Sequence, residues 1–243
     1  MAPVLVRKGP VMNNTHPPSH AGTRFRKFSL RTLLIAATLI SVVLIPVALE
    51  MNGVRQRIMA IAEVQKFSGT ITYDDDGYVT NIAFSRAHEI TDTDLGDLIP
   101  HLEKFPKLSW LEIQSSRISD TGLPRLTRLQ SLEHLFITGA PVTDAGISSL
   151  SEMPNLQSLT FQGERLTDDS LATLARLPKL EMIGLSSPVI TDHGLAHLAS
   201  LRNLEQLDLT GTNVTEAGLK ELGALLPNRF IVLDSTGPGA KAY

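Results

Sequence analysis

The sequence of 243 residues contains no cysteine. This absence excludes disulfide bonds and thiolate metal sites, although it does not exclude an oxidising compartment. Aromatic residues are few, at 5%, and Trp110 is the single tryptophan. A low aromatic content is expected of a chain that copies one small aliphatic unit.

The first 31 residues lack acidic side chains and carry six Lys or Arg side chains. Residues 50–243 hold the other 16 basic residues and all 25 acidic ones, which gives them a net charge of −9. Because nucleic-acid binding requires Lys and Arg clustered against phosphates, this acidic region is a poor candidate for it. We therefore expect no nucleic-acid partner.

Charge is absent from residues 32–49, an 18-residue stretch rich in Leu, Ile, Val and Ala. As a helix it would be roughly 27 Å long, close to the thickness of a bilayer core. The basic cluster of residues 1–31 lies entirely before it, which predicts a single-pass cell-membrane protein. Residues 1–31 would then form a disordered cytoplasmic tail, and the rest of the chain would lie outside the cytoplasm. A cleaved signal peptide and a buried soluble helix are the alternatives.

A helix and a hairpin are predicted after this stretch. In residues 50–68, the apolar side chains of Val54, Ile58, Ile61 and Val64 recur every three or four residues, as in an amphipathic helix. This helix could cover the end of a repeat array, lie on a membrane, or self-associate through residues 54–66. Residues 69–89 contain two alternating runs around an Asp-Gly turn, which predicts a capping hairpin and the first repeat strand.

A six-residue phrase recurs through residues 90–234. Five copies follow one another at intervals of 24 residues, and an earlier copy that begins at Ile90 lies 28 residues upstream of them. A fixed period of this size indicates a solenoid, in which each unit buries its apolar face against its neighbours. The five regular copies are Ile118-Ser-Asp-Thr-Gly-Leu123, Val142-Thr-Asp-Ala-Gly-Ile147, Leu166-Thr-Asp-Asp-Ser-Leu171, Ile190-Thr-Asp-His-Gly-Leu195 and Val214-Thr-Glu-Ala-Gly-Leu219.

A second run, Leu-x-x-Leu-x-Leu, precedes each of these copies, as in Leu132-Glu-His-Leu135-Phe-Ile137. Leu135 and Ile137 alternate as the inward residues of a strand. Leucines three residues apart after each phrase predict a short outer helix. The phrase begins that helix, because its threonine can cap free N–H groups and its aspartate favours the positive end of the helix dipole.

These runs resemble the leucine-rich repeat. The resemblance implies an α/β solenoid with a parallel concave sheet and short helices on the convex side. The repeat region is similar to that of bacterial membrane-anchored repeat proteins and to that of eukaryotic F-box substrate receptors, although no F-box-like helical segment precedes the repeats. The usual buried asparagine is missing, so no asparagine ladder is expected. Residues 235–243 are expected to form a flexible C-terminal tail.

The outward strand positions of such a domain would line its concave face and could bind a partner. Trp110, His134 and Phe136 are predicted to be neighbours, about 5 Å apart, and clustered aromatic residues are typical anchors of interfaces. The alternative is that the N-terminal cap covers these rings. In the last strand, Phe230 and Val232 are predicted to lie outward. The candidate concave residues are Trp110, Glu112, His134, Phe136, Ser158, Thr160, Met182, Gln206 and Asp208.

No catalytic motif occurs in the sequence. His193 and His197 are four residues apart on a predicted outer helix, but they have no obvious third ligand, so we interpret them as a surface pair. We expect a non-catalytic scaffold, without cofactor or metal, that binds an unidentified protein or envelope ligand. A structural envelope protein without a discrete ligand and an F-box-like adaptor are the alternatives.

Overall fold

The structure is a computed structural model that describes residues 37–38, 41–42, 45–114, 116–226, 231–233 and 241–242. The chain divides into two units, residues 1–49 and 50–243. Within these described ranges, no helix has both the length and the apolar character needed to cross a membrane. Half of the predicted span of residues 32–49 lies outside the described residues. The sequence predicted a separate helix that starts at residue 50, but helix α2, Ile45–Lys66, begins five residues earlier.

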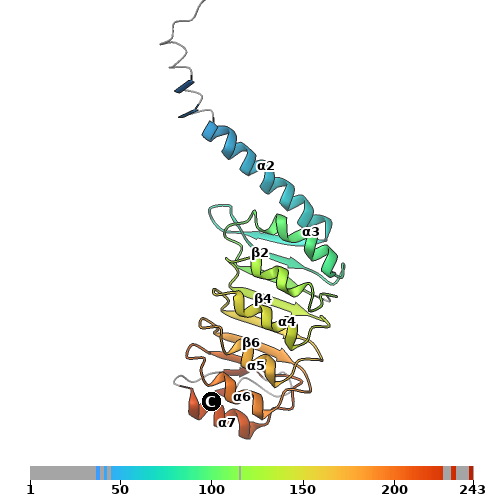
Figure 1. Cartoon of the computed structure of the whole chain (residues 1–243), viewed down its shortest axis with the longest axis vertical. Coiled ribbons are helices and arrows are strands. Elements are labelled where there is room, and N and C mark those ends of the chain that lie inside the picture. Colours follow the sequence, from blue (N-terminus) through green and yellow to red (C-terminus); the bar gives the residue numbers. More distant parts are fainter. Residues whose placement is uncertain are drawn as a thin grey trace, which may run out of the picture. The chain divides into compact units, whose positions relative to one another are not determined.

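One nine-stranded sheet runs through residues 50–243, and its strand order follows the sequence (Figure 1). Strands β2 to β8 are parallel to their neighbours, whereas β1 and β9 pair antiparallel at the two edges. An outer segment connects each parallel strand to the next one. This arrangement is the predicted leucine-rich-repeat solenoid. The strands are β1 Gly69–Tyr73, β2 Val79–Phe84, β3 Trp110–Ile113, β4 His134–Thr138, β5 Ser158–Gln162, β6 Met182–Ser186, β7 Gln206–Asp208, β8 Ile231–Leu233 and β9 Lys241–Ala242.

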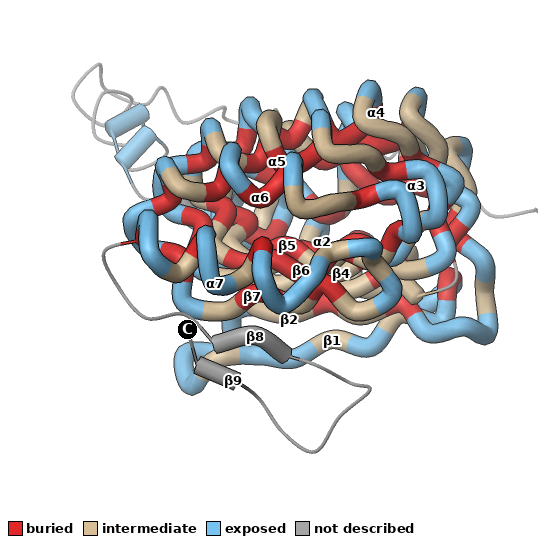
Figure 2. Tube along the Cα trace, turned by 90° about the horizontal axis from the view of Figure 1, so that it is seen from below, coloured by how far each residue is buried: buried red, intermediate tan, exposed pale blue. Residues whose placement is uncertain are grey.

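The outer segments are short helices, as the leucine spacing predicted. Buried residues form a continuous layer between these helices and the strands (Figure 2). In the repeat of β4, the inward residues Leu135 and Ile137 are fully buried, as is Ile147 of the following helix. The outer segments are α3 Asp92–Leu102, η2 Leu123–Arg128, α4 Asp144–Ser149 with η3 Leu150–Glu152, α5 Asp168–Leu174, α6 Asp192–Leu198 and α7 Glu216–Leu225.

The C-terminal edge of the sheet differs from the prediction. Strand β8 pairs Ile231 with Gln206 and Leu233 with Asp208. The sequence had placed Phe230 and Val232 at these positions, so the predicted alternation is shifted by one residue, and a shift of one residue exchanges the two faces of a strand. Beyond it, β9 pairs antiparallel with β8, in the segment 235–243 where a flexible tail was expected.

The N-terminal hairpin is built as predicted, from β1, β2 and a turn. The Asp74 carboxylate accepts hydrogen bonds from the backbone N–H groups of Asp76, at 3.1 Å, and Tyr78, at 2.8 Å. Gly77 has a φ of +81°, which favours glycine in this turn. The Lys107 ammonium lies 2.9 Å from Asp74. The three consecutive aspartates therefore belong to a turn, and Lys107 is the cationic side chain beside two of them.

Helix α2 covers the same end of the solenoid with its last turns. Ala60 and Val64 are completely buried, and Ile61 packs against the core. The predicted apolar face is only partly used, however, because Val54 and Ile58 keep 44% and 61% of their surface exposed. The residues that pack on the solenoid are thus displaced round the helix from the stripe that the sequence indicated.

The repeated phrase also connects consecutive repeats, which the sequence analysis did not predict. Each phrase threonine caps its own helix, and each aspartate accepts hydrogen bonds from the threonine or serine at the corresponding position of the next copy. Asp144 accepts from the backbone N–H of Thr167, at 2.9 Å, and from its hydroxyl, at 2.6 Å. We call this series the Thr-Asp ladder. Its other pairs are Asp92–Ser119, Asp120–Thr143, Asp168–Thr191 and Asp192–Thr215.

The glycine of the phrase leaves space for the ladder carboxylate of the preceding copy. A Cβ atom at Gly146 would lie 2.5 Å from Oδ1 of Asp120, which is closer than real Cβ contacts. In one of the five regular copies this glycine is replaced by Ser170, whose hydroxyl donates a hydrogen bond to Asp144. The position therefore requires either no side chain or one that donates to the carboxylate.

Candidate functional site

Three aromatic side chains lie together on the sheet, as the sequence predicted. The strand register places Trp110 beside His134, and Phe136 lies two residues further along β4. The rings of Trp110 and Phe136 stack with centroids 4.4 Å apart and an interplanar angle of 23°. The His134 ring centroid is 5.1 Å from that of Trp110. All three side chains are half-buried, so the N-terminal cap leaves them partly accessible.

These rings form one side of an open pocket of about 350 Å³ that extends across β3 to β7. Six of the nine predicted concave residues line it, and they come from five successive strands. The parallel register explains this grouping, because it aligns the first outward residue of each strand in one row. The predicted residues in the pocket are Trp110, His134, Phe136, Ser158, Met182 and Gln206.

The other three predicted residues do not line this pocket and interact within the sheet. Glu112 accepts a hydrogen bond from the Gln114 amide at 2.5 Å. Asp208 accepts from the backbone N–H of Thr210, at 3.0 Å, and from its hydroxyl, at 2.6 Å. Thr160 lies beside Gly184 in the register. The structure therefore places these three members of the second outward row beside the pocket, whereas Phe136 of the same row lines it.

The floor of the pocket is firmly packed. Ser158 is 5% exposed, and its hydroxyl lies 3.0 Å from the sulfur of Met182. A thioether is a flexible, polarizable contact surface that adapts to different ligands. The pocket therefore combines rigid rings at one end with an adaptable apolar side chain near its centre.

The pocket also has an acidic rim that was not predicted from the sequence. Gln157, Glu181 and Glu205 line it from the position directly before β5, β6 and β7. A signal was present, because the first leucine of the strand run is followed by glutamate in Leu180-Glu181 and Leu204-Glu205. None of the described residues that line the pocket is Lys or Arg. These carboxylates lie at the opposite end of the pocket from the rings, and they favour a cationic group of a ligand there.

The histidine pair of α6 remains a surface feature. His193 and His197 are both exposed. Within the part of the chain that the structure describes, no three or more His, Asp or Glu side chains are grouped closely enough to hold a metal ion.

Comparisons with known proteins find matches among solved structures alone. No protein-family model matches the sequence, and no curated protein matches it. Internalin C2 of Listeria monocytogenes is 23% identical over 65% of this chain and 81% of its own, with a TM-score of 0.40. A second internalin of that organism is 16% identical over 66% and 48%, with a TM-score of 0.45. A leucine-rich-repeat protein of Leptospira interrogans is 18% identical over 55% and 33%, with a TM-score of 0.40.

The chain thus spans 48% of the second internalin and 33% of the Leptospira protein. All three TM-scores are below 0.5, so these likenesses establish neither the fold nor a binding property of this chain. The repeat architecture of this chain is established by its own strand register and by the phrase that begins each outer segment.

Proposed function

We propose that the protein is a non-catalytic leucine-rich-repeat scaffold that binds a protein partner through its concave pocket. The observation that carries this proposal is the stacked pair of Trp110 and Phe136, half-buried beside an open pocket on a regular sheet. Tryptophan and other aromatic residues supply large contact areas with little conformational entropy to lose, and they dominate the energy of many interfaces.

The charge of the site defines the partner more narrowly. Glu181 and Glu205 lie on the pocket rim, and residues 50–243 have a net charge of −9. An acidic surface accelerates the association of a basic partner and favours a cation near its carboxylates. We infer a protein segment that presents Lys or Arg to the rim carboxylates at one end of the pocket and an apolar residue to the rings of Trp110 and Phe136 at the other.

The membrane arrangement is part of the same proposal. The uncharged stretch of residues 32–49 would anchor the chain in the cell membrane, with the basic residues 1–31 in the cytoplasm and the repeats outside. Protease added to intact cells would then digest the repeat region and leave the N-terminal tail protected. Digestion of both parts only after lysis would refute this orientation.

Binding can be tested with a fluorescent library of basic peptides and anisotropy as the measurement. For a peptide that binds, Phe136→Ala should weaken the affinity by about 2 kcal/mol, roughly 30-fold. Tyr78→Ala, which removes an exposed ring of the cap hairpin, is the matched control and should leave the peptide affinity unchanged. The double substitution Glu181→Gln and Glu205→Gln should lower the affinity for basic peptides and leave the affinity for neutral peptides unchanged. Equal affinity of the Phe136→Ala variant and the parent would refute the site.

A further inference from the structure

Helix α2 carries an apolar stripe that the solenoid does not cover. Ala60 and Val64 form its buried face, whereas Met51, Val54 and Ile58 expose 68%, 44% and 61% of their surface. At 100° per residue, the stripe is centred roughly 120° round the helix from the buried face. Three such side chains in a row on one helix are more than the scattered exposure that a protein surface normally shows.

The spacing of the stripe is that of a coiled-coil seam. Met51, Val54 and Ile58 are separated by three and then four residues, which makes Met51 and Ile58 a positions and Val54 a d position of a heptad repeat. In the sequence the same spacing continues upstream at Val47 and Leu44. A strict heptad spacing is characteristic of two helices that supercoil about each other.

Charges beside the stripe fit a second copy of the same helix. In this register Glu50 occupies a g position and Arg55 the e position of the next heptad. In a parallel two-stranded coil these positions lie opposite each other on the two helices and pair across the interface. Two-fold symmetry would form the Glu50–Arg55 pair twice. Within the described residues, neither side chain forms an ion pair in the single chain.

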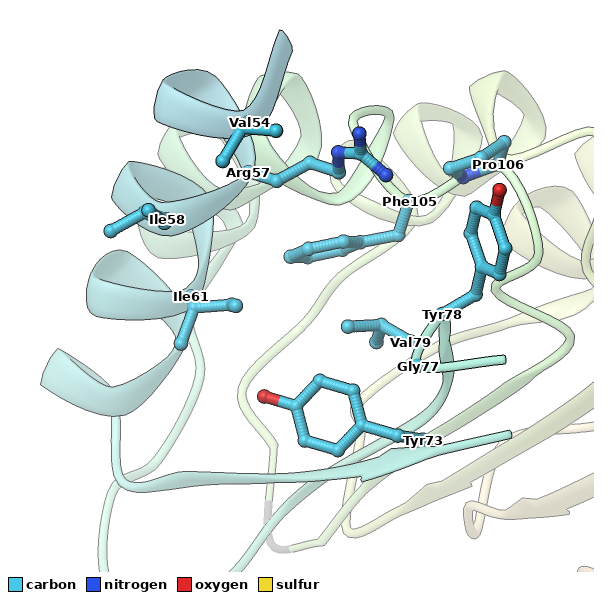
Figure 3. A pocket seen from close by; sticks show the side chains of 10 residues that line it. All are labelled: Val54, Arg57, Ile58, Ile61, Tyr73, Gly77, Tyr78, Val79, Phe105 and Pro106. Atoms are coloured by element: carbon cyan, nitrogen blue, oxygen red, sulfur yellow. The ribbon is translucent and has the colours of Figure 1, made fainter. Parts of the chain in front are cut away.

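The stripe also forms one wall of an open cavity of about 260 Å³. Val54, Ile58 and Ile61 of α2 face Tyr73, Val79 and Phe105 across this space (Figure 3). Tyr73 is half exposed, at 50%. A helix laid against the stripe would remove the exposed surfaces of Val54, Ile58 and Tyr73 from water, and that burial would stabilise the contact.

We propose that α2 pairs with α2 of a second copy as a parallel coiled coil, with Met51, Val54 and Ile58 at the seam. Each copy would then present its own concave pocket, so the assembly binds its partner bivalently. This pairing does not depend on the proposed concave-face function, and the two can fail separately.

The lack of cysteine allows a direct test in the full chain. Met51→Cys and Met59→Cys replace two exposed methionines of the same helix, the first at the seam and the second at a b position away from it. A disulfide needs Cα atoms roughly 4–7 Å apart. Under mild oxidation in membranes or detergent, Met51→Cys should form a covalent dimer, and Met59→Cys should remain monomeric.

Charge reversal supplies the second arm. In the Met51→Cys background, Arg55→Glu places like charges opposite each other and should slow dimer formation, and adding Glu50→Arg should restore it. Thermal unfolding of each variant shows whether the repeats remain folded. Cross-linking that is equal at both positions, absent at Met51→Cys, or unaffected by charge reversal would overturn the proposal. Those results would instead indicate that lipid or a different protein covers the stripe.

Discussion

Substituting a carboxylate of the Thr-Asp ladder should destabilise the solenoid although that carboxylate is part of no hydrophobic core. Asp144→Ala is the sharpest case. Asp144 accepts from the N–H of Thr167, at 2.9 Å, from the Thr167 hydroxyl, at 2.6 Å, and from the Ser170 hydroxyl. Ser170 is completely buried. The alanine variant would therefore leave buried or half-buried donors without their acceptor.

The size of the effect follows from these three bonds. A hydrogen bond to a charged group stabilises a protein by about 1.5–3 kcal/mol, but contributions at one site are not additive, and water reaches part of this carboxylate. We expect a loss of about 3 kcal/mol, which for a domain of this size corresponds to a decrease in melting temperature of about 6–12 °C.

Urea denaturation followed by circular dichroism would measure this loss. Asp169→Ala is the matched control, because Asp169 is the exposed neighbouring acid in the first turn of α5, and it should change stability by less than about 0.5 kcal/mol. Hydrogen exchange should show the opening concentrated at α5 and its neighbouring helices, because each repeat contacts only adjacent repeats. Equal destabilisation by the two substitutions would refute the ladder's role and leave only a general helix-dipole effect.

Three further perturbations probe the same framework. Gly146→Ala should destabilise the chain by about 1–3 kcal/mol, because its Cβ would crowd Asp120, and Gly146→Ser should be milder because its hydroxyl can donate; urea midpoints compare them. Acidification should destabilise the protein, because Asp92, Asp144 and Asp192 have a lowered pKa in the folded state. These carboxylates stabilise the fold above the unfolded pKa of about 4, and that stabilisation is lost as the pH falls through the folded pKa. Urea midpoints measured from pH 7 to pH 3 test this. Arg128→Ala should cost at most about 1 kcal/mol, because its pairing with Glu103 is partly exposed, and 1 M salt should reduce the difference from the parent.

The direction of the acid effect has a definite physical cause. Burial raises the pKa of Asp144, but hydrogen bonds from Ser170 and Thr167 outweigh burial and hold the pKa below its ordinary value. For Asp192, hydrogen bonds from Thr215 are the main cause of the lowered pKa. Because protonation removes an acceptor that only the folded state uses, both groups favour folding above the unfolded pKa and not below the folded pKa.

The repeat architecture could be predicted from sequence because its determinants are local and are copied. Leu135 and Ile137 alternate within one strand, and Thr143 sits where a helix must begin, so each can be recognised without knowledge of its neighbours in space. The parallel register then follows from the constant 24-residue period. This is why Trp110, His134 and Phe136 could be placed together before their contacts were known.

Features that depend on particular neighbours could not be predicted in this way. The partners of Asp144 lie in the next copy, 23 and 26 residues away, and the threonine already had a sufficient role as a cap. The face that α2 buries is set by the end of the solenoid rather than by its own apolar spacing. In β8 the 24-residue period did not determine which residues face outward, and Ile231 rather than the predicted Phe230 pairs with Gln206.

The positions that stabilise this fold and those proposed to bind a partner belong to different parts of each repeat. The ladder joins the starts of the outer helices, where Thr and Asp recur with little change, whereas the pocket row changes from Trp110 to His134, Ser158, Met182 and Gln206 along the strands. Since these pocket side chains are mostly half-buried, their replacement removes less apolar contact than a change at Leu135 would. A solenoid can therefore exchange its pocket row while the ladder and core keep the register, and the loss of binding in a Phe136→Ala variant that remains folded would be the direct sign of that separation.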